Sequence, residues 1–454
     1  MTIVQHGKTA AHAAARLANF ALSADLSDMP DSVVEKAKGC LMDFLACSIE
    51  AGTLPWGEQT IAYASSMAGG GAAIVGTSIR TSPAEAAFAN GALSHGLIRE
   101  DMHVPSCSHL GTVVIPPLLA LASTQTGRDF LTSLIVGYET GARIGRALIN
   151  TELATRIRPT GTVGAMAGAA GAARLLALSE GEAISALGFG ANCACGVNEW
   201  PWAGGTDVFF HAGFASRNAV TAVLLAKTGA FASPTAIDGR AGLFAVYGRR
   251  AEAEKIIPLA DGNYEILSVY WKPAPACNYV QTPCQAALAL ANQGIRPDDI
   301  SRVEVRSFNA AIRYPGCDHS GPYPGILEAK MSIQYSVAAT LVSGRIEESN
   351  YALLKDPRVL RLAQAMRLLV DDDLEKNYPQ KQGVEIMVVL KDGTRHTERR
   401  DDVHAVDYEG VRTRLHKTVS SHLGTCKADA AIAAIETLET GGAVGDVLAA
   451  VTRS

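Results

Sequence analysis

The sequence predicts a mainly α-helical protein, in which a large all-helical domain carries an inserted smaller α+β lid domain. Three observations predict this fold class. The first half is rich in Ala, Leu and Gly, with apolar residues at helical spacing. Strand-like alternation begins only after about residue 258, and a helical pattern returns after about residue 405. We therefore expect a helical domain over 1–262, a lid over 263–403 and a return to the helical domain over 404–454.

Two stretches of the first half have clear helix boundaries. In PDSVVEKAKGCLMDFLACSIEAG, Pro30 suits the start of a helix, the apolar residues follow helical spacing, and Gly52 can end it. In SPAEAAFANGALSHGL, Ser82 is a plausible cap and Pro83 lies just inside the helix. The Gly-rich segment between them predicts a loop with a short β-like run. The small residues of 113–150 and 161–230 predict buried, closely packed helices.

The lid is expected to contain both strands and helices. ISRVEVRSFNA alternates apolar and polar residues, which is typical of a strand. GVEIMVVLKDGTRHTERRD holds Lys-Asp-Gly between two alternating runs, which predicts a hairpin. Two helical stretches lie between them, at roughly 328–343 and 357–371. The last segment, including KADAAIAAIETLETGGAV, has no strand pattern and predicts helices that rejoin the large domain.

The composition excludes several classes of protein. The chain has 454 residues, 48% of them hydrophobic and 19% charged, and a net charge of −5, which is typical of a globular protein. No basic block indicates nucleic-acid binding, and no apolar run approaches the roughly 20 residues that span a bilayer. The first twenty residues predict an amphipathic helix rather than a signal peptide. Nine scattered cysteines fit a reducing compartment, so we expect a cytoplasmic location.

One polar stretch interrupts the apolar first half. SHGLIREDMHVPSCSHLGT, residues 94–112, gathers three histidines, an Arg-Glu-Asp run and a cysteine. Titratable groups concentrated in this way are typical of acid/base chemistry. We interpret the stretch as one wall of a pocket for an acidic substrate.

Five segments occur in an order that resembles the MmgE/PrpD family, which includes 2-methylcitrate dehydratase, cis-aconitate decarboxylase and iminodisuccinate epimerase. They are the two helices quoted above, RPTGTVGAMAGAA, FFHAGFASRNAVTAVLLAKTGAFASP and YWKPAPACNYVQTPCQAAL. The resemblance covers nearly the whole chain. It implies a helical domain, a smaller lid, a homodimer with the active site between the domains, and cofactor-free acid/base chemistry on small polycarboxylates.

The resemblance also implies site positions in the first half, several of them replaced. The family's Asp-x-Asp-Asp followed by His-Pro matches Arg99, a reversal of charge, then Asp101 and His109. The histidine of its His-Pro-Thr motif is Arg158 in this chain. The lysine three residues before its His-x-Gly falls at Val208.

The remaining matches are one position in the helical domain and three in the lid. His211 keeps the histidine of His-x-Gly, and Lys272 matches the lysine at the lid junction. Cys277 stands five residues on, where some members carry histidine. A tyrosine of the lid matches Tyr314, with Tyr323 as the competing choice.

Each residue has a functional and a structural interpretation. His109 can be the general base, because its pKa lies close to neutral pH, or a structural histidine. Arg99 and Arg158 can hold substrate carboxylates through a two-point contact, or pair with neighbouring acids such as Glu100. Asp101 can fix the tautomer of a histidine or pair with Arg99.

The other candidates carry the same two interpretations. Lys272 can act as acid, base or carboxylate ligand, or be an exposed linker residue. His211 can bind substrate or cap its helix, and His103 can bind substrate or simply cap or orient its neighbours. Cys277 can be a nucleophile or base, or fill the space of a histidine, and Tyr314 can donate a proton or stabilise an enolate-like oxygen.

We therefore predict catalytic roles for His109, Lys272, Asp101 and Tyr314, substrate-binding roles for Arg99, Arg158, His103, His211 and Cys277, and neither metal nor cofactor. The predicted function is a dehydratase-type lyase acting on a small di- or tricarboxylate by proton abstraction next to a carboxylate. An epimerase or isomerase, a decarboxylase, or an altered family member that only binds such an acid remain alternatives. The expected partners are the substrate and a second copy of the chain, with no nucleic acid and no membrane.

Overall fold

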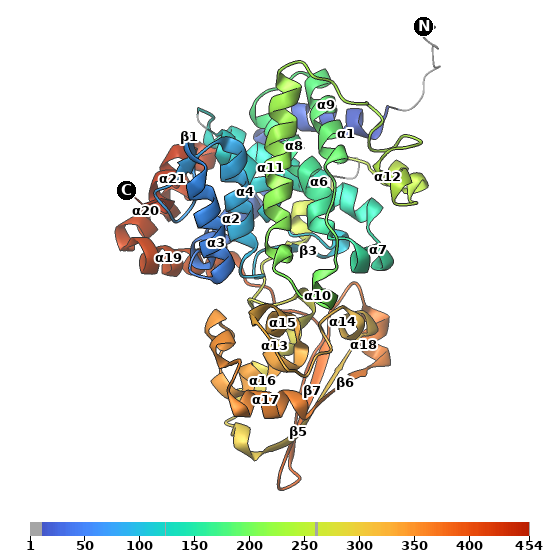
Figure 1. Cartoon of the computed structure of the whole chain (residues 1–454), viewed down its shortest axis with the longest axis vertical. Helices are drawn as coiled ribbons and strands as arrows, with labels where there is room; N and C mark the ends of the chain where they lie inside the picture. The colour runs from blue at the N-terminus through green and yellow to red at the C-terminus, as the bar shows by residue number, and fades with distance from the viewer. Residues whose placement is uncertain (1–10, 123, 259–261, 454) are drawn as a thin grey trace.

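The structure is a computed structural model that describes residues 11–122, 124–258 and 262–453. It has a helical body and, below it in Figure 1, a smaller α+β lid. The main helices of the body are α1 (Ala13–Ser23), α2 (Asp31–Ala51), α3 (Pro55–Ser66), α4 (Pro83–His95), α5 (Gly111–Leu121), α6 (Gly127–Leu148), α7 (Thr151–Arg156), α8 (Pro159–Leu175), α9 (Glu180–Asn192), α10 (Trp200–Ala203), α11 (His211–Lys227) and α12 (Leu243–Val246). The prediction of a mainly α fold is confirmed.

The helix boundaries follow the signals in the sequence. Helix α2 starts directly after Pro30, and Gly52 stands at its C-terminal end. In α4 the Ser82 side chain accepts a hydrogen bond from the backbone N–H of Glu85, which satisfies one of the free donors of the first turn. The predicted N-terminal helix is described from Ala13, and residues 1–10 lie outside the described part of the chain.

Small residues allow the central helices of the body to pack closely. A Cβ added to Gly164 of α8 would lie 2.7 Å from Cγ1 of Val113 in α5. A Cβ added to Gly168, one turn later, would lie 2.7 Å from the Val113 carbonyl oxygen. Side chains at these glycines would push α5 and α8 apart, and these helices start just after His109 and Arg158, two residues of the site described below.

The lid contains a four-stranded sheet with the strand order β6-β5-β7-β8. Strand β5 (Ile300–Ser307) pairs parallel with β6 (Met366–Val370) and antiparallel with β7 (Val384–Leu390), which pairs antiparallel with β8 (Arg395–Arg400). The predicted hairpin is therefore confirmed. The lid helices are α13 (Gln281–Ala291), α14 (Asn309–Arg313), α15 (Ile326–Met331), α16 (Ile333–Ser343), α17 (Pro357–Gln364) and α18 (Asp372–Asn377). Short two-stranded pairs, β1 (Ala68–Ala73) with β2 (Arg80–Thr81) and β3 (Met102–His103) with β4 (Val269–Tyr270), lie outside the lid sheet.

One predicted element of the lid is wrong. The helix expected over 357–371 ends at Gln364, and 366–370 form strand β6 on the edge of the sheet. Residues 366–370 read Met-Arg-Leu-Leu-Val, a short apolar run whose local pattern does not separate helix from strand. Pairing with β5, a contact distant in sequence, decides the conformation.

The last helices of the chain return to the body, beside α2 in Figure 1. They are α19 (Tyr408–Leu423), α20 (Thr425–Glu436) and α21 (Val444–Val451). Their buried residues share one hydrophobic cluster with α1, α2, α4 to α9 and α11. A second cluster fills the lid and also includes Ile98, Trp200 and Val208, which come from the body. The core of the lid therefore continues across the junction between the two parts.

A buried lysine of the lid fastens it to the body. The ammonium of Lys330 in α15 donates to the Leu97 carbonyl of the body at 3.0 Å and to the Pro275 carbonyl at 3.1 Å. It also forms an ion pair of 2.6 Å with Glu348. The Lys330 side chain is completely buried. Its three donors thus connect the junction, the body and the lid.

Replacing Lys330 by methionine is expected to lower the free energy of unfolding by about 3 kcal/mol, because it leaves a largely buried carboxylate and two carbonyls without their donor. Urea unfolding followed by circular dichroism measures the change. Lys376→Met is the matched control, because that lysine and its partner Asp373 are both exposed. Equal stability of the two variants would contradict the assigned role of Lys330.

One helical stretch, Asp207–Lys227, is long and apolar enough to cross a membrane by length and composition, with a mean hydropathy of 1.3. This differs from the expectation that no apolar segment reaches such a length. The same test is passed by buried helices, and 56% of the most apolar 18-residue window of this stretch is buried within the structure. Helix α11, its main part, packs against α4, α8 and α9.

Candidate active site

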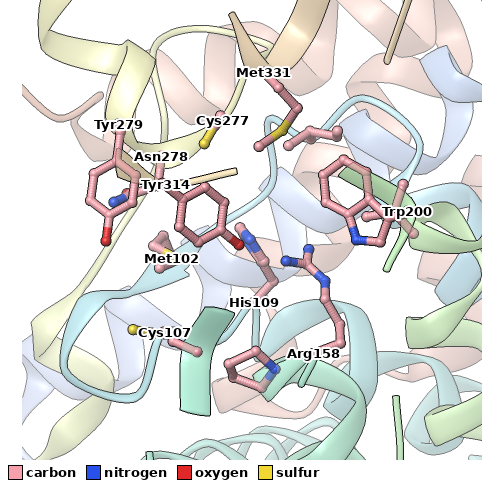
Figure 2. A pocket seen from close by; sticks show the side chains of 14 residues that line it. Met102, Cys107, His109, Arg158, Trp200, Cys277, Asn278, Tyr279, Tyr314 and Met331 are labelled. Atoms are coloured by element: carbon pink, nitrogen blue, oxygen red, sulfur yellow. The ribbon is translucent and has the colours of Figure 1, made fainter. Parts of the chain in front are cut away.

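A cavity lies between the body and the lid, with an empty volume of about 580 Å³ that includes the part open to solvent. Its walls come from both parts of the molecule, as Figure 2 shows. The body contributes Ile98, Met102, Cys107, His109, Ala154, Arg158, Pro159, Trp200 and Val208, and the lid contributes Cys277, Asn278, Tyr279, Tyr314 and Met331. A hollow at a junction between two parts of a chain, lined by apolar side chains and a few polar groups, is typical of small-molecule binding sites.

Arg158 supplies the positive charge in the wall. It precedes α8 as the N-cap residue, and its side chain is only 7% exposed. Its Nη2 donates to Nε2 of His95 at 2.8 Å, while its buried Nε has no hydrogen-bond partner among the described residues. A guanidinium with unused donors in a cavity is suited to bind a carboxylate at two points.

His95 connects Arg158 to a buried acid. Because its Nε2 accepts from Arg158, its proton lies on Nδ1, which donates to Oε1 of Glu100 at 2.6 Å. Burial lowers the pKa of His95, and the nearby Arg158 adds to this effect, so the ring is neutral. Burial opposes ionisation of Glu100, but His95, His109 and Lys272 outweigh it and hold the pKa of Glu100 far below its usual range. The three side chains therefore fix the position of the guanidinium.

His109 presents a free ring nitrogen to the cavity. Its Nδ1 lies 2.8 Å from the Asp101 carbonyl oxygen, an acceptor, so the proton of the neutral ring lies on Nδ1. No residue in the described part of the chain forms a hydrogen bond with Nε2, and the ring lines the cavity. Burial lowers the pKa of His109 well below its ordinary value. The positive charges of Lys272 and Arg158 lower it further, while the carboxylate of Glu100 acts in the opposite direction. The lone pair of Nε2 is therefore available as a base.

Lys272 lies behind this wall. It is completely buried, and its ammonium donates to the Ala276 carbonyl at 3.1 Å. Burial lowers the pKa of Lys272, while the carboxylate of Glu100 raises it. It is not among the residues that line the cavity, so its effect on the site is the positive charge that it places near His109 and Glu100.

Tyr314 enters from the lid side. It follows α14, lines the cavity, and in Figure 2 its hydroxyl points toward the His109 ring and the Arg158 guanidinium. Burial raises the pKa of Tyr314 to about 12, so the phenol keeps its proton at neutral pH. The competing tyrosine, Tyr323, donates a hydrogen bond from its hydroxyl to the His319 carbonyl and does not line this cavity.

Cys277 also lines the cavity. Its Sγ lies 3.8 Å from Sγ of Cys317, and this contact lowers the pKa of Cys277, with Lys272 and Arg158 acting in the same direction. The neighbouring Asn278 and Tyr279 use their polar atoms within the protein. The Asn278 amide donates a hydrogen bond to Gln382 and accepts one from the Tyr270 hydroxyl, and the hydroxyls of Tyr279 and Tyr378 share a hydrogen bond.

Two predicted residues of the polar stretch point away from the cavity. The Asp101 carboxylate accepts from the Gly111 backbone N–H at 3.2 Å and from the Tyr138 hydroxyl. Burial raises the pKa of Asp101 to about 7. His103 lies between Ser106 and Glu265, at 2.8 and 3.1 Å. Asp101 thus positions His109 only through its backbone carbonyl, and His103 connects two loops of the body.

Two other predicted site residues, Arg99 and His211, do not line the cavity. Arg99 forms an ion pair of 2.8 Å with Glu50 on another face of the junction. His211 starts α11, and its nearest acid is Asp207 at 3.7 Å. Burial lowers the pKa of His211 to about 3, and the positive charge of Arg158 acts in the same direction. The imidazole is therefore neutral. The guanidinium predicted at residue 99 and the imidazole of His109 therefore do not share a cavity.

Sequence reasoning missed several residues of the site. His95 and Glu100 lie in the polar stretch but were not predicted as site residues, and Trp200 and Tyr279 carried no signal at all. Ile98 and Cys107 both line the cavity and both adopt a left-handed backbone, with φ of +55° and +51°. Such a conformation is strained for a branched residue like isoleucine and is often found at functional sites.

Within residues 11–122, 124–258 and 262–453, no group of three or more His, Cys, Asp or Glu side chains is arranged to hold a metal ion. The polar groups that face the cavity can bind an anion, accept a proton at His109 and donate one at Tyr314. This combination suits acid/base chemistry next to a carboxylate.

The lowered pKa of His109 predicts the pH dependence of the reaction. Since the imidazole is a base only when neutral, kcat/KM is expected to stay constant from neutral pH down through the ordinary value of 6.5 and to fall only in more acidic solution. Initial rates over a pH series give this profile. Melting temperatures at the same pH values separate loss of the base from unfolding. Half-maximal kcat/KM at 6.5 or above would contradict a buried neutral His109.

Comparisons with known proteins match both parts of the chain. Residues 15–255 match the MmgE/PrpD N-terminal domain and residues 274–439 match the MmgE/PrpD C-terminal domain. Cis-aconitate decarboxylase from Aspergillus terreus is 25% identical over 410 residues, which cover 84% of this chain and 83% of that protein. The 2-methylcitrate dehydratase of Escherichia coli (strain K12) is 26% identical over 399 residues, 80% of each chain.

A shorter match has higher identity. A cis-aconitate decarboxylase-like protein from Aspergillus oryzae is 34% identical over 226 residues, 47% of each chain. Decarboxylation and dehydration are both lyase-type reactions, so the relatives share a broad class of chemistry with different outcomes. With both domain models matched in order over most of its length, the chain belongs to the MmgE/PrpD family.

Proposed function

We propose that the protein is a lyase that removes a proton from a carbon next to the carboxylate of a small organic acid. The observation that carries this proposal is the unprotonated Nε2 of His109 facing the same cavity as the Arg158 guanidinium. The names of two relatives, a dehydratase and a decarboxylase, support a lyase over other enzyme classes.

In the proposed reaction, a β-hydroxy acid binds with its carboxylate on Arg158. His109 Nε2 takes the proton from the carbon next to that carboxylate, and the electrons of the C–H bond form the double bond. The C–O bond to the hydroxyl breaks, and the leaving oxygen takes the phenolic proton of Tyr314 and departs as water. The proton on His109 then returns to the Tyr314 phenolate through water, which restores both groups.

Alkene formation tests this proposal. A panel of β-hydroxy mono-, di- and tricarboxylates is incubated with the protein, and ultraviolet absorbance follows the unsaturated product. We expect at least one acid to give a time-dependent increase that requires His109. No increase with any acid, with or without added divalent metal, would contradict the dehydratase.

Cys277 supports an epimerase as a second candidate function. Its thiol lines the cavity from the lid, whereas His109 belongs to the body, and its pKa is lowered by Cys317, Lys272 and Arg158. A thiol and an imidazole from different walls can exchange a proton on two faces of one carbon. Solvent deuterium entering the substrate without alkene would favour this function, and release of CO₂ would favour a decarboxylase. Binding of an acid without any of these reactions would leave only a binding role.

A further inference from the structure

The cavity offers few polar groups to a ligand. Asn278 and Tyr279 use their polar atoms on Gln382, Tyr270 and Tyr378, within the lid and at the junction. Among the described residues that line the cavity, this leaves Arg158, His109 and Tyr314 as the strong hydrogen-bonding groups directed into it.

Only one of these groups carries a permanent positive charge. Lys272 is completely buried, donates to the Ala276 carbonyl and lies near the carboxylate of Glu100, so its charge is largely compensated. Arg99 is turned to Glu50 on another face of the junction. The cavity therefore provides one cation, Arg158, for the charge of a substrate.

The rest of the wall is apolar. Ile98, Trp200 and Val208 from the body and Met331 from the lid line the cavity and belong to the hydrophobic cluster of the lid. These side chains are nearly fully buried. In Figure 2, Trp200 lies on the far side of the Arg158 guanidinium from Tyr314, and Met331 lies above both of them in the view. A carboxylate placed against this wall would lose its hydration without finding a partner, which is costly.

We infer that the substrate is a monocarboxylic acid with a branched or otherwise apolar substituent, and this inference rests on the proposed function. The single carboxylate lies on Arg158, the reacting carbons lie between His109 and Tyr314, and the substituent packs against Ile98, Trp200, Val208 and Met331. This differs from the di- or tricarboxylate predicted from the resemblance, because the described lining has one cation and the apolar wall offers no charged partner to a further carboxylate.

A matched pair of ligands tests this directly. Malate and 3-hydroxy-4-methylpentanoate share the β-hydroxy acid unit and differ in one group, a carboxylate in the first and an isopropyl group of similar size in the second. Isothermal titration calorimetry on the full-length protein at fixed ionic strength gives both dissociation constants. We expect the monocarboxylate to bind at least tenfold more tightly. Tighter or equal binding of malate, or binding of neither acid, would overturn the inference.

A change in the apolar wall provides a second test. Val208→Lys adds a cation to the wall and is expected to shift the ratio of the two dissociation constants toward malate by at least tenfold. Val208→Met adds bulk without charge and should leave this ratio unchanged. Circular dichroism checks that both variants are folded. If Val208→Lys does not fold, the ligand pair on the unchanged protein still decides the question. If Val208→Lys is folded and still prefers the monocarboxylate to the same degree, the apolar substituent of the ligand does not lie at this wall.

These results are separate from those that test the reaction. Binding of the monocarboxylate without alkene or deuterium exchange would keep the substrate class and overturn the proposed lyase. Turnover of malate with weaker binding of the monocarboxylate would keep the lyase and overturn the substrate class.

Discussion

Replacing His109 by glutamine is expected to lower kcat/KM by about 10³-fold, the effect typical of losing a general base. Glutamine can still donate to the Asp101 carbonyl, which His109 does at 2.8 Å, but it has no basic nitrogen to present to the cavity. Because Arg158 is untouched, the dissociation constant of a carboxylate ligand should change little. Steady-state rates and calorimetry on the same preparation separate these two effects.

His103→Gln is the matched control for this variant. His103 is also a buried histidine of the polar stretch, but it lies between Ser106 and Glu265 and does not line the cavity. We expect it to lower the melting temperature while kcat/KM stays within a few-fold of the unchanged protein. A His109→Gln variant that retained kcat/KM within tenfold, or a His103→Gln variant that lost as much, would show that the base is misassigned.

Replacing Arg158 by glutamine is expected to lower kcat/KM by about 10²-fold or more, the loss typical of removing one partner of a buried, hydrogen-bonded charge pair. Most of this loss should appear as a higher KM and a weaker dissociation constant for the carboxylate. The glutamine amide can still donate to Nε2 of His95, which accepts from Arg158 at 2.8 Å, so the neighbouring residues keep their hydrogen bond. Initial rates over a range of substrate concentrations give kcat and KM separately.

Two further variants make this result specific. Arg156→Gln removes an arginine two residues earlier that is exposed and paired with Glu152, so its kinetics should be unchanged. Arg158→Lys keeps the charge but not the planar fork, and we expect it to recover only part of the affinity. Full affinity in Arg158→Gln would mean that the carboxylate is held elsewhere.

The fold could be predicted where local signals and packing agree. The capping residues Ser82 and Pro83, and the Lys-Asp-Gly turn of the lid hairpin, act within a few residues of the chain, and the structure has the elements they predict. Strand β6 could not be predicted, because its conformation depends on pairing with β5, about 60 residues earlier.

The site was partly accessible from the sequence. The motifs identified His109, Arg158, Cys277 and Tyr314, and all four line the cavity. The direction of each side chain was not accessible. Ile98 and Arg99 are neighbours, yet Ile98 faces the cavity and Arg99 faces Glu50, and the left-handed backbone at Ile98 that separates them leaves no mark in the sequence.

Three of the cavity residues that sequence reasoning missed share one property. Trp200, Tyr279 and Met331 are aromatic or apolar, and such residues are normally interpreted as core. They reach the cavity only because the lid packs on the body, which brings together positions far apart in the chain. Trp200 and Met331 contribute to the apolar wall, which decides the inferred substrate class.

The central claim is that neutral His109 takes a proton from the carbon next to a carboxylate held by Arg158. Incubation in D₂O, followed by mass spectrometry of the recovered substrate and product, tests it most directly. We expect the unchanged protein to exchange the hydrogen on that carbon, and the His109→Gln variant to exchange it at least a hundredfold more slowly although it still binds the acid. Equal exchange by the two proteins would contradict the account.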